Sequence, residues 1–300
     1  MRLENEVAIV TGSTKGLGRF VAERYAAEGA KVVVSGRNAE AGNRVVAQIA
    51  AKGGSAIFVR ADVMIEEDVK NLIKTAVDTF GKLSIMVNNA CPTEFVYDAA
   101  IAGDASGSAT SRRDGSVRNI STENWQQLIL GTLTQVFWCC KYSIPEIAKA
   151  GGGSIINVSS QSGMQAQAGL AGYSSGKSAL FGLTRSIAIE EAPNGIRCNC
   201  ICVGVIPGEA PAAADKAEAA AWEGEVGSFG WAIRTAPLLG MGEGGDMANL
   251  ALFLGSRESK YLTGLIVPVD GGWTINSHLP SLDLLHKEAE QTRAKDRGAA

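Results

Sequence analysis

Histidine is almost missing from this chain of 300 residues, and the two that it has, His278 and His286, lie near its C-terminus. A Ser-His-Asp hydrolase needs a histidine beside its nucleophile, and a His-ligated zinc enzyme needs several around the metal. Because the first 277 residues contain no histidine, the sequence argues against both classes of enzyme.

Long apolar runs are missing as well. No stretch reaches the roughly 18 consecutive apolar residues that a helix needs to span a bilayer, so we expect no membrane segment. The first residues, MRLENEVAIVTG, carry acidic side chains before the first apolar run. They show no small-residue cleavage site and do not resemble a signal peptide. We therefore expect a cytoplasmic protein.

An excess of positive charge is also absent, since 28 basic and 31 acidic residues give a formal net charge of -3. Nucleic-acid-binding proteins hold phosphate backbones with a basic surface. The charge therefore argues against nucleic acid as the main partner and favours a small-molecule ligand.

The six cysteines form no CxxC pair. Cys198, Cys200 and Cys202 alternate along an apolar run, which places them on one face if that run is a strand. We expect them to be small buried side chains in a reducing compartment, and we predict no metal site.

Apolar runs rich in valine and isoleucine alternate with helical-period segments along most of the chain. The expected strands are EVAIVTG, KVVVSG, SAIFVRADV, LSIMVNNA, SIINVSS, IRCNCICVG and LIVPVDGG. Helices are expected near residues 16–28, 39–52, 65–80 and 122–150, around Tyr173, and before the last strand. This order predicts an α/β fold, with a Rossmann-type doubly wound parallel sheet of about seven strands in three α/β/α layers. We expect one domain over residues 1–272.

Three segments depart from this order. Residues 98–120 are small, polar and without period, which predicts an irregular surface loop. For residues 208–239 we predict a helical lid that closes over an apolar ligand. The alternative is that this segment is an ordinary flap packed on the core. The aromatic residues of that segment are Trp222, Phe229 and Trp231. The tail, residues 273–300, ends in a charged helical pattern that suits either a solvated helix or a subunit contact.

The stretch TGSTKGLG, residues 11–18, lies where the first strand turns into a helix. Glycine lets the backbone approach a pyrophosphate closely, and a helix N-terminus offers free N–H groups. The spacing differs from GxGxxG, so simple turn chemistry remains an alternative. The candidate cofactor contacts are Gly12, Ser13, Thr14, Lys15, Gly16, Leu17 and Gly18.

The second strand ends in Ser35, Gly36 and Arg37. NAD sites place an acidic residue here for the ribose 2'-hydroxyl. Arginine instead makes charge-assisted bonds with a 2'-phosphate, which a carboxylate would repel. Lys15 can add a second positive charge. With Ser35 and Arg37 as contacts, we expect NADP(H) as the cofactor.

The stretch GYSSGKSAL places Tyr173 and Lys177 four residues apart on an expected helix. An ammonium group one turn away favours the phenolate, which helps a tyrosine with an ordinary pKa of about 10 to act as an acid/base. Such a pair also occurs on ordinary helices. The preceding strand ends in Ser159 and Ser160, at the edge where a parallel sheet presents its ligand groups.

Together, TGxxxGxG, NNA after the fourth strand, and a serine thirteen residues before YxxxK resemble the classical short-chain dehydrogenase/reductase family. The resemblance extends over about residues 3–272. It implies that Tyr173 is the general acid/base and that Ser160, in preference to Ser159, polarises the substrate carbonyl. It also implies that Lys177 binds the nicotinamide ribose and lowers the tyrosine pKa.

The resemblance implies further cofactor contacts. Asp62 and Val63 resemble the adenine contacts, and Asn89 and Ala90 lie where the family's central strand lines the cofactor. Gly204 and Ile206 follow the sixth strand, and Ile206 matches the residue that meets the carboxamide.

Four positions depart from the family's pattern. They are Cys91 in place of the glycine of NNAG, Val203 in place of the proline before Gly204, Gly208 in place of a threonine, and Thr132 in place of the catalytic asparagine, counted from Trp125. Thr132 remains a catalytic candidate. Its hydroxyl can hold a water that links Lys177 to solvent, or it can bond to a carbonyl of its own helix.

The expected function is an NADP(H)-dependent oxidoreductase that interconverts a ketone or aldehyde with an alcohol by hydride transfer, with Tyr173 as general acid/base. The resemblance implies a homo-oligomer, a dimer or a tetramer. Two alternatives stay open, a nucleotide-binding sensor or scaffold without turnover, and non-redox chemistry such as that of a lyase or epimerase on the same fold.

Overall fold

A computed structural model of the chain describes residues 1–92, 114–206 and 238–276. Within these residues lies a parallel sheet of seven strands in the order β3-β2-β1-β4-β5-β6-β7. The strands are β1 (Val7–Val10), β2 (Lys31–Gly36), β3 (Ser55–Arg60), β4 (Ile85–Asn88), β5 (Gly153–Ser160), β6 (Ile196–Val203) and β7 (Ile266–Val269). The direction of winding reverses between β1 and β4, which is where open α/β sheets bind their ligands. The expected doubly wound fold is confirmed.

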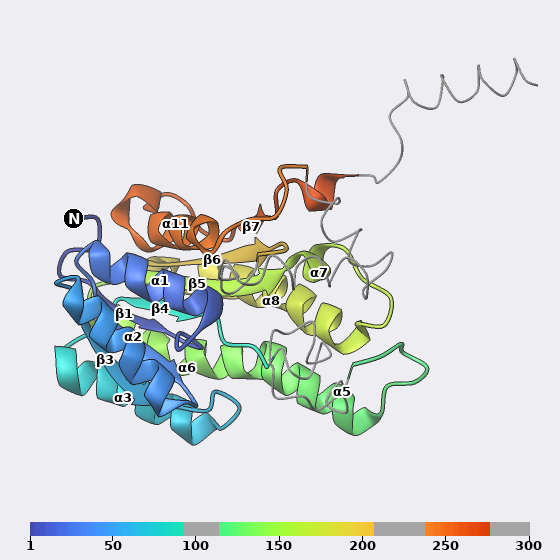
Figure 1. Ribbon diagram of the computed structural model, residues 1–300, viewed down its shortest axis with the longest axis horizontal. Helices are drawn as coiled ribbons and strands as arrows, with labels where there is room; N and C mark the ends of the chain where they lie inside the picture. The colour runs from blue at the N-terminus through green and yellow to red at the C-terminus, as the bar shows by residue number, and fades with distance from the viewer. Residues whose placement is uncertain (93–113, 207–237, 277–300) are drawn as a thin grey trace, which may run out of the picture.

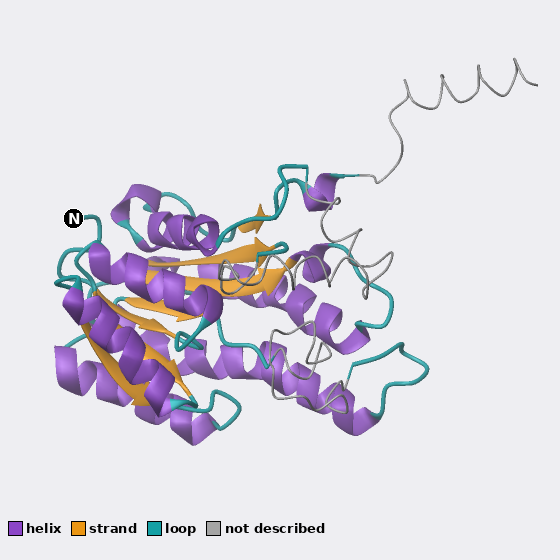
Figure 2. Cartoon of the chain, viewed as in Figure 1, coloured by secondary structure: helices purple, strands orange, loops and turns teal. Residues whose placement is uncertain are grey.

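Helices cover both faces of the sheet (Figures 1 and 2). One face carries α1 (Gly16–Ala27), α2 (Ala39–Ala51) and α11 (Gly244–Gly255), and the other carries α3 (Glu66–Phe80), α6 (Gln135–Lys149) and α8 (Ala171–Glu190). Each interface is filled by a cluster of buried apolar side chains. Strands buried on both faces appear in the sequence as continuous apolar runs, which is why they were predictable.

Shorter helical segments complete the described part of the chain. They are α5 (Thr122–Ile129), the π-helix η2 (Leu130–Thr134), α7 (Gln161–Met164), and the 3-10 turns η3 (Ala192–Asn194), η5 (Arg257–Ser259) and η6 (Trp273–Ile275). The helix expected over 122–150 is therefore present, but a π-helical turn divides it into α5 and α6. Such turns interrupt α-helices and are frequent at functional sites.

The three alternating cysteines of β6, Cys198, Cys200 and Cys202, are buried in the layer that also contains α3, α6 and α8. All three are free thiols. Burial raises the pKa of the Cys198 thiol well above its usual range. The prediction of small buried side chains is confirmed for this strand.

The irregular segment expected over 98–120 is described only from residue 114 onward. Its described part, residues 114–120, contains no helix or strand and is exposed at residues 116–119, whereas Asp114 is 8% exposed. The lid predicted over 208–239, including its three aromatic residues, lies outside the described residues apart from its last two positions. Most of the predicted tail lies outside them as well.

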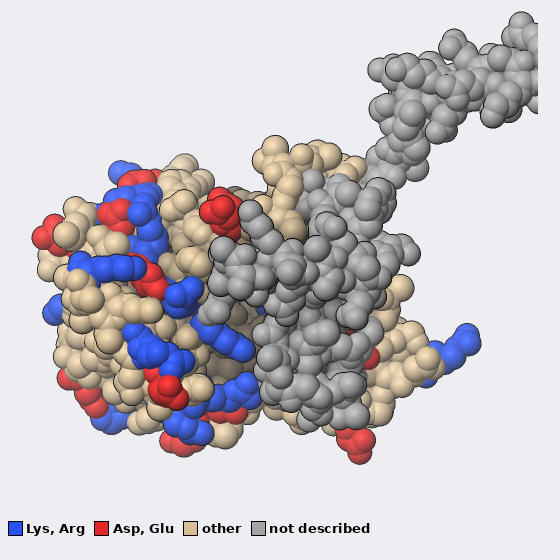
Figure 3. Space-filling model, in the orientation of Figure 1, with Lys and Arg blue, Asp and Glu red and all other residues tan. Residues whose placement is uncertain are grey.

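The described surface carries charges of both signs. On the face shown in Figure 3, Lys and Arg side chains are intermingled with Asp and Glu. None of the described helices has both the length and the apolar character needed to cross a bilayer.

Candidate active site

The turn between β1 and α1 depends on glycine at two positions. Gly12 has a φ of +64°, and a Cβ atom there would lie 2.9 Å from Cα of Ala90, at the end of β4. A Cβ atom on Gly18 would lie 2.5 Å from the carbonyl oxygen of Gly12. Larger residues would push the turn away from β4, so glycine keeps the two backbones in contact.

The N-terminus of α1 suits an anion. Lys15, the residue before the helix, is extended and makes no side-chain capping bond within the described part of the chain, and the first turn contains no acidic residue. The first N–H groups of a helix lack intrahelical acceptors and carry partial positive charge. The residues present therefore fit the pyrophosphate of a dinucleotide.

Ser13 and Ser35 lie beneath this turn and fix it to β2. The backbone N–H of Ser13 donates to the carbonyl of Ser35 at 2.9 Å, and the N–H of Ser35 donates to Oγ of Ser13 at 3.0 Å. Oγ of Ser13 donates in turn to the carbonyl of Val10 at 2.6 Å. Both serine residues are fully buried. The structure thus places these two predicted contacts where they support the loop, whereas Lys15 is exposed.

Basic residues lie at the ends of neighbouring elements on this side of the site. Lys15 is in the β1–α1 turn and Arg37 follows β2, and both are exposed. The last residue of β2, Gly36, pairs in register with Arg60 of β3, a third exposed basic residue that the sequence analysis did not single out. Thr14 packs here too, since a Cβ atom on Gly36 would lie 2.8 Å from its methyl carbon.

Asn89 ties the end of β4 to the glycine loop. Its Nδ2 donates to the carbonyls of Thr11 and Gly12 at 2.9 and 3.3 Å. The hydroxyl of Thr11 accepts from the backbone N–H groups of Asn89 and Ala90, each at 3.0 Å. Thr11 is thus a supporting residue that the sequence analysis missed, although it begins the glycine stretch.

The remaining predicted cofactor contacts also follow the carboxyl ends of strands. Asp62 and Val63 come after β3 and are partly buried, and Oδ1 of Asp62 accepts from the backbone N–H of Met64 at 3.0 Å. Gly204 and Ile206 come after β6 and are partly buried. These contacts therefore lie at the same edge of the sheet as the glycine loop.

Tyr173 and Lys177 lie in the first two turns of α8. They are 7% and 3% exposed, and Nζ of Lys177 lies 5.7 Å from the centroid of the tyrosine ring. The same Nζ donates to the carbonyl of Val158 on β5 at 2.8 Å. The ammonium group is therefore held beside the tyrosine ring in the interior of the protein.

The two serines at the end of β5 have different partners. Oγ of Ser159 donates to the carbonyl of Lys177 at 2.8 Å and so holds α8 against the strand. Oγ of Ser160 accepts from the backbone N–H of Ser162 at 3.1 Å, as the cap of α7. An accepting bond leaves the hydroxyl proton of Ser160 available for a ligand, whereas the proton of Ser159 is already donated.

Thr132 occupies the middle of the π-helical turn and is fully buried. Its hydroxyl donates to the carbonyl of Leu128 at 2.6 Å. Asn124 is in the first turn of α5, where its backbone N–H donates to Ser121. Thr132, eight residues further along, lies beside the turn that contains Lys177, since a Cβ atom on Gly176 would lie 1.8 Å from Oγ1 of Thr132.

Apolar groups pack around the tyrosine. Leu128 of α5, Leu170 and Tyr173 form one buried cluster, and Cys91 and Ile120 pack against it. Cys91, which stands where the family has glycine, therefore adds its side chain beside Tyr173.

Three buried polar residues link β4, β5 and α8 behind the site. Nδ2 of Asn88 donates to Oδ1 of Asn157 at 2.9 Å, and Nδ2 of Asn157 donates to the hydroxyl of Thr184 at 2.9 Å. The sequence analysis did not identify this network. An asparagine inside the apolar run SIINVSS was the signal that could have revealed it, because buried polar side chains need partners.

Two further residues were missed, and neither has a local sequence signal. Gln135, directly after the π-helical turn, donates from Nε2 to the carbonyl of Ala90 at 2.9 Å. Asp114 accepts from the backbone N–H groups of Gly172 and Tyr173. Both contacts join segments that are far apart in the sequence.

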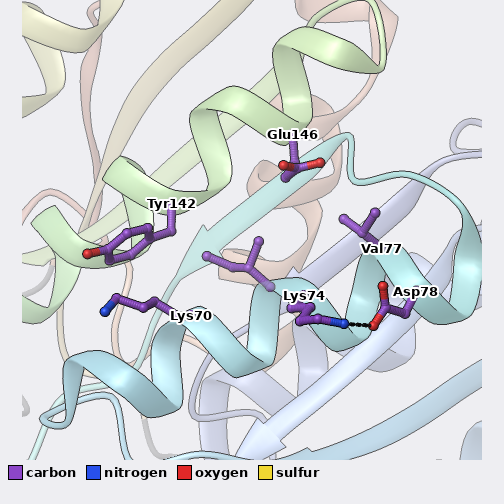
Figure 4. A pocket seen from close by; sticks show the side chains of 7 residues that line it. Lys70, Lys74, Val77, Asp78, Tyr142 and Glu146 are labelled. Carbon is purple, nitrogen blue, oxygen red and sulfur yellow. Dashed lines mark hydrogen bonds and ion pairs between the residues drawn. The ribbon is translucent and has the colours of Figure 1, made fainter.

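A groove of about 300 Å³ lies elsewhere, between α3 and α6 (Figure 4). It is lined by Lys70, Ile73, Lys74, Val77, Asp78, Tyr142 and Glu146. Lys74 and Asp78 form an ion pair there. None of the predicted site residues lines this groove, so it is separate from the candidate active site.

Comparison with known proteins identifies the family. Residues 6–219 match the sequence model of the family described as short chain dehydrogenase. A 2,5-dichloro-2,5-cyclohexadiene-1,4-diol dehydrogenase of Sphingobium indicum is 36% identical, over 91% of this chain and 98% of its own. A cyclohexanol dehydrogenase of an Acinetobacter species is 33% identical, over 91% of this chain and 96% of its own.

A solved structure agrees with these sequence matches. The short-chain type dehydrogenase/reductase from Mycobacterium ulcerans superposes with a TM-score of 0.75 at 26% identity, covering 92% of each chain. The motifs, the strand order and the matched lengths all lead to the same result. The chain belongs to the short-chain dehydrogenase/reductase family of oxidoreductases.

Proposed function

We propose that the protein is an NADP(H)-dependent oxidoreductase that interconverts a ketone or aldehyde with the corresponding alcohol. The observation that carries this proposal is the buried pair of Tyr173 and Lys177, with 5.7 Å between the ammonium nitrogen and the ring centroid. The pair lies at the same edge of the sheet as the glycine loop. An acid/base group beside a dinucleotide cradle suits proton transfer coupled to hydride transfer.

Tyr173 moves the proton in this proposal. In the reductive direction its hydroxyl donates to the substrate oxygen, and in the oxidative direction its phenolate accepts the alcohol proton. Lys177 stabilises the phenolate, and its bond to Val158 keeps the ammonium group in place. Ser160 holds the substrate oxygen with its free hydroxyl proton. A bound nicotinamide cofactor supplies or accepts the hydride.

The glycine loop and the N-terminus of α1 would hold the pyrophosphate of the cofactor. Asp62 and Val63 would contact the adenine, while Asn89, Ala90, Gly204 and Ile206 would line the remainder of the cofactor. The family's dehydrogenases use nicotinamide cofactors, and the exposed Lys15 and Arg37 support NADP(H) in particular, because guanidinium and ammonium groups attract a 2'-phosphate.

We further propose a secondary alcohol on a six-membered carbon ring, or the matching ring ketone, as the substrate class. The names of two relatives describe such compounds, a cyclohexadienediol and cyclohexanol. Cys91 and Ile120, which are partly buried against the apolar cluster that contains Tyr173, suit a hydrocarbon ring.

Assembly into a homo-oligomer and a cytoplasmic location are part of the proposal. Size-exclusion chromatography with light scattering should give the mass of a dimer or tetramer, and a monomer would contradict that part.

The test of the activity is oxidation of NADPH with a panel of cyclohexanone, a linear ketone and an aldehyde, and reduction of NADP⁺ with cyclohexanol. We expect turnover in both directions, fastest with the ring compounds. NADPH binding without turnover on any compound would favour a sensor or scaffold. Conversion of a compound with no net change in NADPH would favour lyase or epimerase chemistry.

A further inference from the structure

The helix that carries Tyr173 and Lys177 has an unusual N-terminus. The first N–H groups of an α-helix have no acceptor within the helix, and the residue before it commonly supplies one. Leu170 precedes α8 and makes no side-chain capping bond within the described residues, and the first turn contains no acidic residue. The acceptors come instead from Asp114 and Gly115, more than 50 residues earlier in the chain.

These two residues satisfy three successive N–H groups of the first turn. The carbonyl of Gly115 accepts from Ala171 at 3.2 Å. Oδ1 of Asp114 accepts from Gly172 at 2.9 Å, and Oδ2 accepts from Tyr173 at 2.8 Å. The carboxylate therefore binds the backbone of the tyrosine itself.

The environment of Asp114 favours this arrangement. The side chain is 8% exposed, and Oδ1 also accepts from the N–H of Gly115 at 2.8 Å. Three N–H donors and the positive end of a helix dipole stabilise a buried carboxylate. Gly172 lets this turn pack closely on α5, because a Cβ atom there would lie 2.6 Å from Cδ1 of Leu128.

The opposite side of the same two turns is held by β5. Oγ of Ser159 donates to the carbonyl of Lys177 at 2.8 Å. The segment from Tyr173 to Lys177 is thus fixed at its first residue by Asp114 and at its last by Ser159. Proton transfer requires the tyrosine hydroxyl to stay within hydrogen-bond distance of the substrate oxygen, so the position of this backbone bears directly on turnover.

We propose that Asp114 is a positioning residue for the reaction: its carboxylate fixes the first turn of α8 and thereby sets Tyr173 for proton transfer. This inference rests on the proposed function of Tyr173. It predicts that loss of the carboxylate lowers kcat more than it weakens binding of substrate or cofactor, because the carboxylate acts on the backbone of Tyr173 and Asp114 is not among the proposed ligand contacts.

The test compares Asp114→Ala and Asp114→Asn with the unmodified protein, each assayed well below its melting temperature. We expect Asp114→Ala to lower kcat for cyclohexanone by about 10-fold or more, since small displacements of reacting groups are costly. KM and the Kd of NADPH should change by less than about 2-fold. Asp114→Asn should have an intermediate kcat, because its amide has one acceptor oxygen where the carboxylate uses two.

Ser256→Ala is the matched control. Ser256 is buried and caps the turn η5 by accepting from the N–H of Glu258 at 3.3 Å, and η5 carries none of the predicted site residues. We expect this variant to lose stability, as removal of a helix cap does, while its kcat stays that of the unmodified protein.

Amide hydrogen exchange of the peptide that contains residues 171–178 gives a readout independent of activity. We expect faster exchange in Asp114→Ala and unchanged exchange in Ser256→Ala. Unchanged kcat in both Asp114 variants would overturn the assignment of Asp114. So would an equal fall in kcat in Ser256→Ala when the two variants lose the same stability. The proposed function would survive that result as long as Tyr173→Phe remains inactive. Full activity of Tyr173→Phe would instead overturn the proposed function and the positioning role with it.

Discussion

Thr132 packs directly against Gly176, the residue of α8 that lies between Tyr173 and Lys177 in the sequence. A Cβ atom at position 176 would lie 1.8 Å from Oγ1 of Thr132. The threonine hydroxyl donates to the carbonyl of Leu128 in its own helix. Of the two arrangements that the sequence leaves open, the structure has the second. The hydroxyl proton is bound to the helix, which leaves it unable to donate at the same time to a water beside Lys177.

Substitutions of Thr132 test this arrangement. Thr132→Val keeps the shape that packs on Gly176 and removes only the hydroxyl, so we expect kcat to stay within about 3-fold of the unmodified protein. Thr132→Asn should change kcat by less than about 10-fold, or about 1.4 kcal/mol of barrier, with NADPH affinity unchanged. Steady-state kinetics and a cofactor titration measure both.

A tenfold loss in Thr132→Val would show that the hydroxyl takes part in proton transfer. A gain far above 10-fold in Thr132→Asn would mean that the natural protein is catalytically impaired, which favours the sensor interpretation.

Gly176→Ala should destabilise the fold, because the added methyl group overlaps Thr132. Overpacking of a filled core typically costs about 1–3 kcal/mol of unfolding free energy. The double variant Thr132→Ala/Gly176→Ala should recover part of the loss, since Oγ1 is removed. Denaturant unfolding of the four proteins gives the coupling energy.

Gly182→Ala in the same helix is the control for that experiment. Among the described residues, no atom outside the neighbouring backbone of the helix lies within 4 Å of a Cβ at position 182, so this substitution should be neutral or stabilise the helix by up to about 1 kcal/mol. Strictly additive effects of Thr132→Ala and Gly176→Ala would contradict the contact between the two residues.

The two serines at the end of β5 should differ in kind. Ser160→Ala removes a donor to the substrate oxygen, so we expect kcat to fall by about 100-fold. Ser159→Ala removes the bond to the carbonyl of Lys177, which should cost about 1 kcal/mol of unfolding free energy. We expect its fall in kcat to be much smaller than that of Ser160→Ala. Kinetics and thermal unfolding of both variants decide the matter, and the reverse ranking of kcat would assign the substrate contact to Ser159.

Cofactor preference should follow the exposed basic residues. We expect tighter binding of NADPH than of NADH, and a loss of roughly 10-fold in NADPH affinity for Arg37→Ala and for Lys15→Ala, with little change for NADH. Arg44→Ala, on the exposed surface of α2 where Arg44 pairs with Glu40, is the matched control and should bind both cofactors normally.

Combining Gly36→Asp with Arg37→Ala should shift the preference toward NADH. Thr14 must move to admit the new side chain, because its methyl carbon lies 2.8 Å from the position of a Cβ at residue 36. Equal affinity of the unmodified protein for NADPH and NADH would contradict the roles of Lys15 and Arg37.

The sheet was predictable because its physical signal is local. Strands such as β1 and β6 are buried on both faces, so each appears as an unbroken apolar run. The order of strands and helices then follows from the rules of βαβ connection. The glycine loop and the Tyr173–Lys177 pair were predictable for a similar reason, since each lies within one short stretch of sequence.

The supporting contacts were not predictable because they join distant segments. Asp114 meets Tyr173 across 59 positions, and Gln135 meets Ala90 across 45. The π-helical turn was also not predictable, because the apolar pattern of residues 122–150 is that of one continuous helix. The extra residue of a π-helical turn does not change that pattern in a recognisable way. The direction of the Thr132 hydroxyl depends on the carbonyl of Leu128, which only the folded helix brings within reach.

The most direct test of the central claim is the turnover of Tyr173→Phe with NADPH and cyclohexanone. Phenylalanine keeps the ring in the cluster with Leu128 and Leu170 and keeps the backbone N–H that Asp114 binds, so the substitution removes the hydroxyl group that carries the transferable proton. We predict a fall in kcat of at least about 100-fold, with the Kd of NADPH unchanged. Turnover close to that of the unmodified protein would contradict the assignment of Tyr173 as the acid/base.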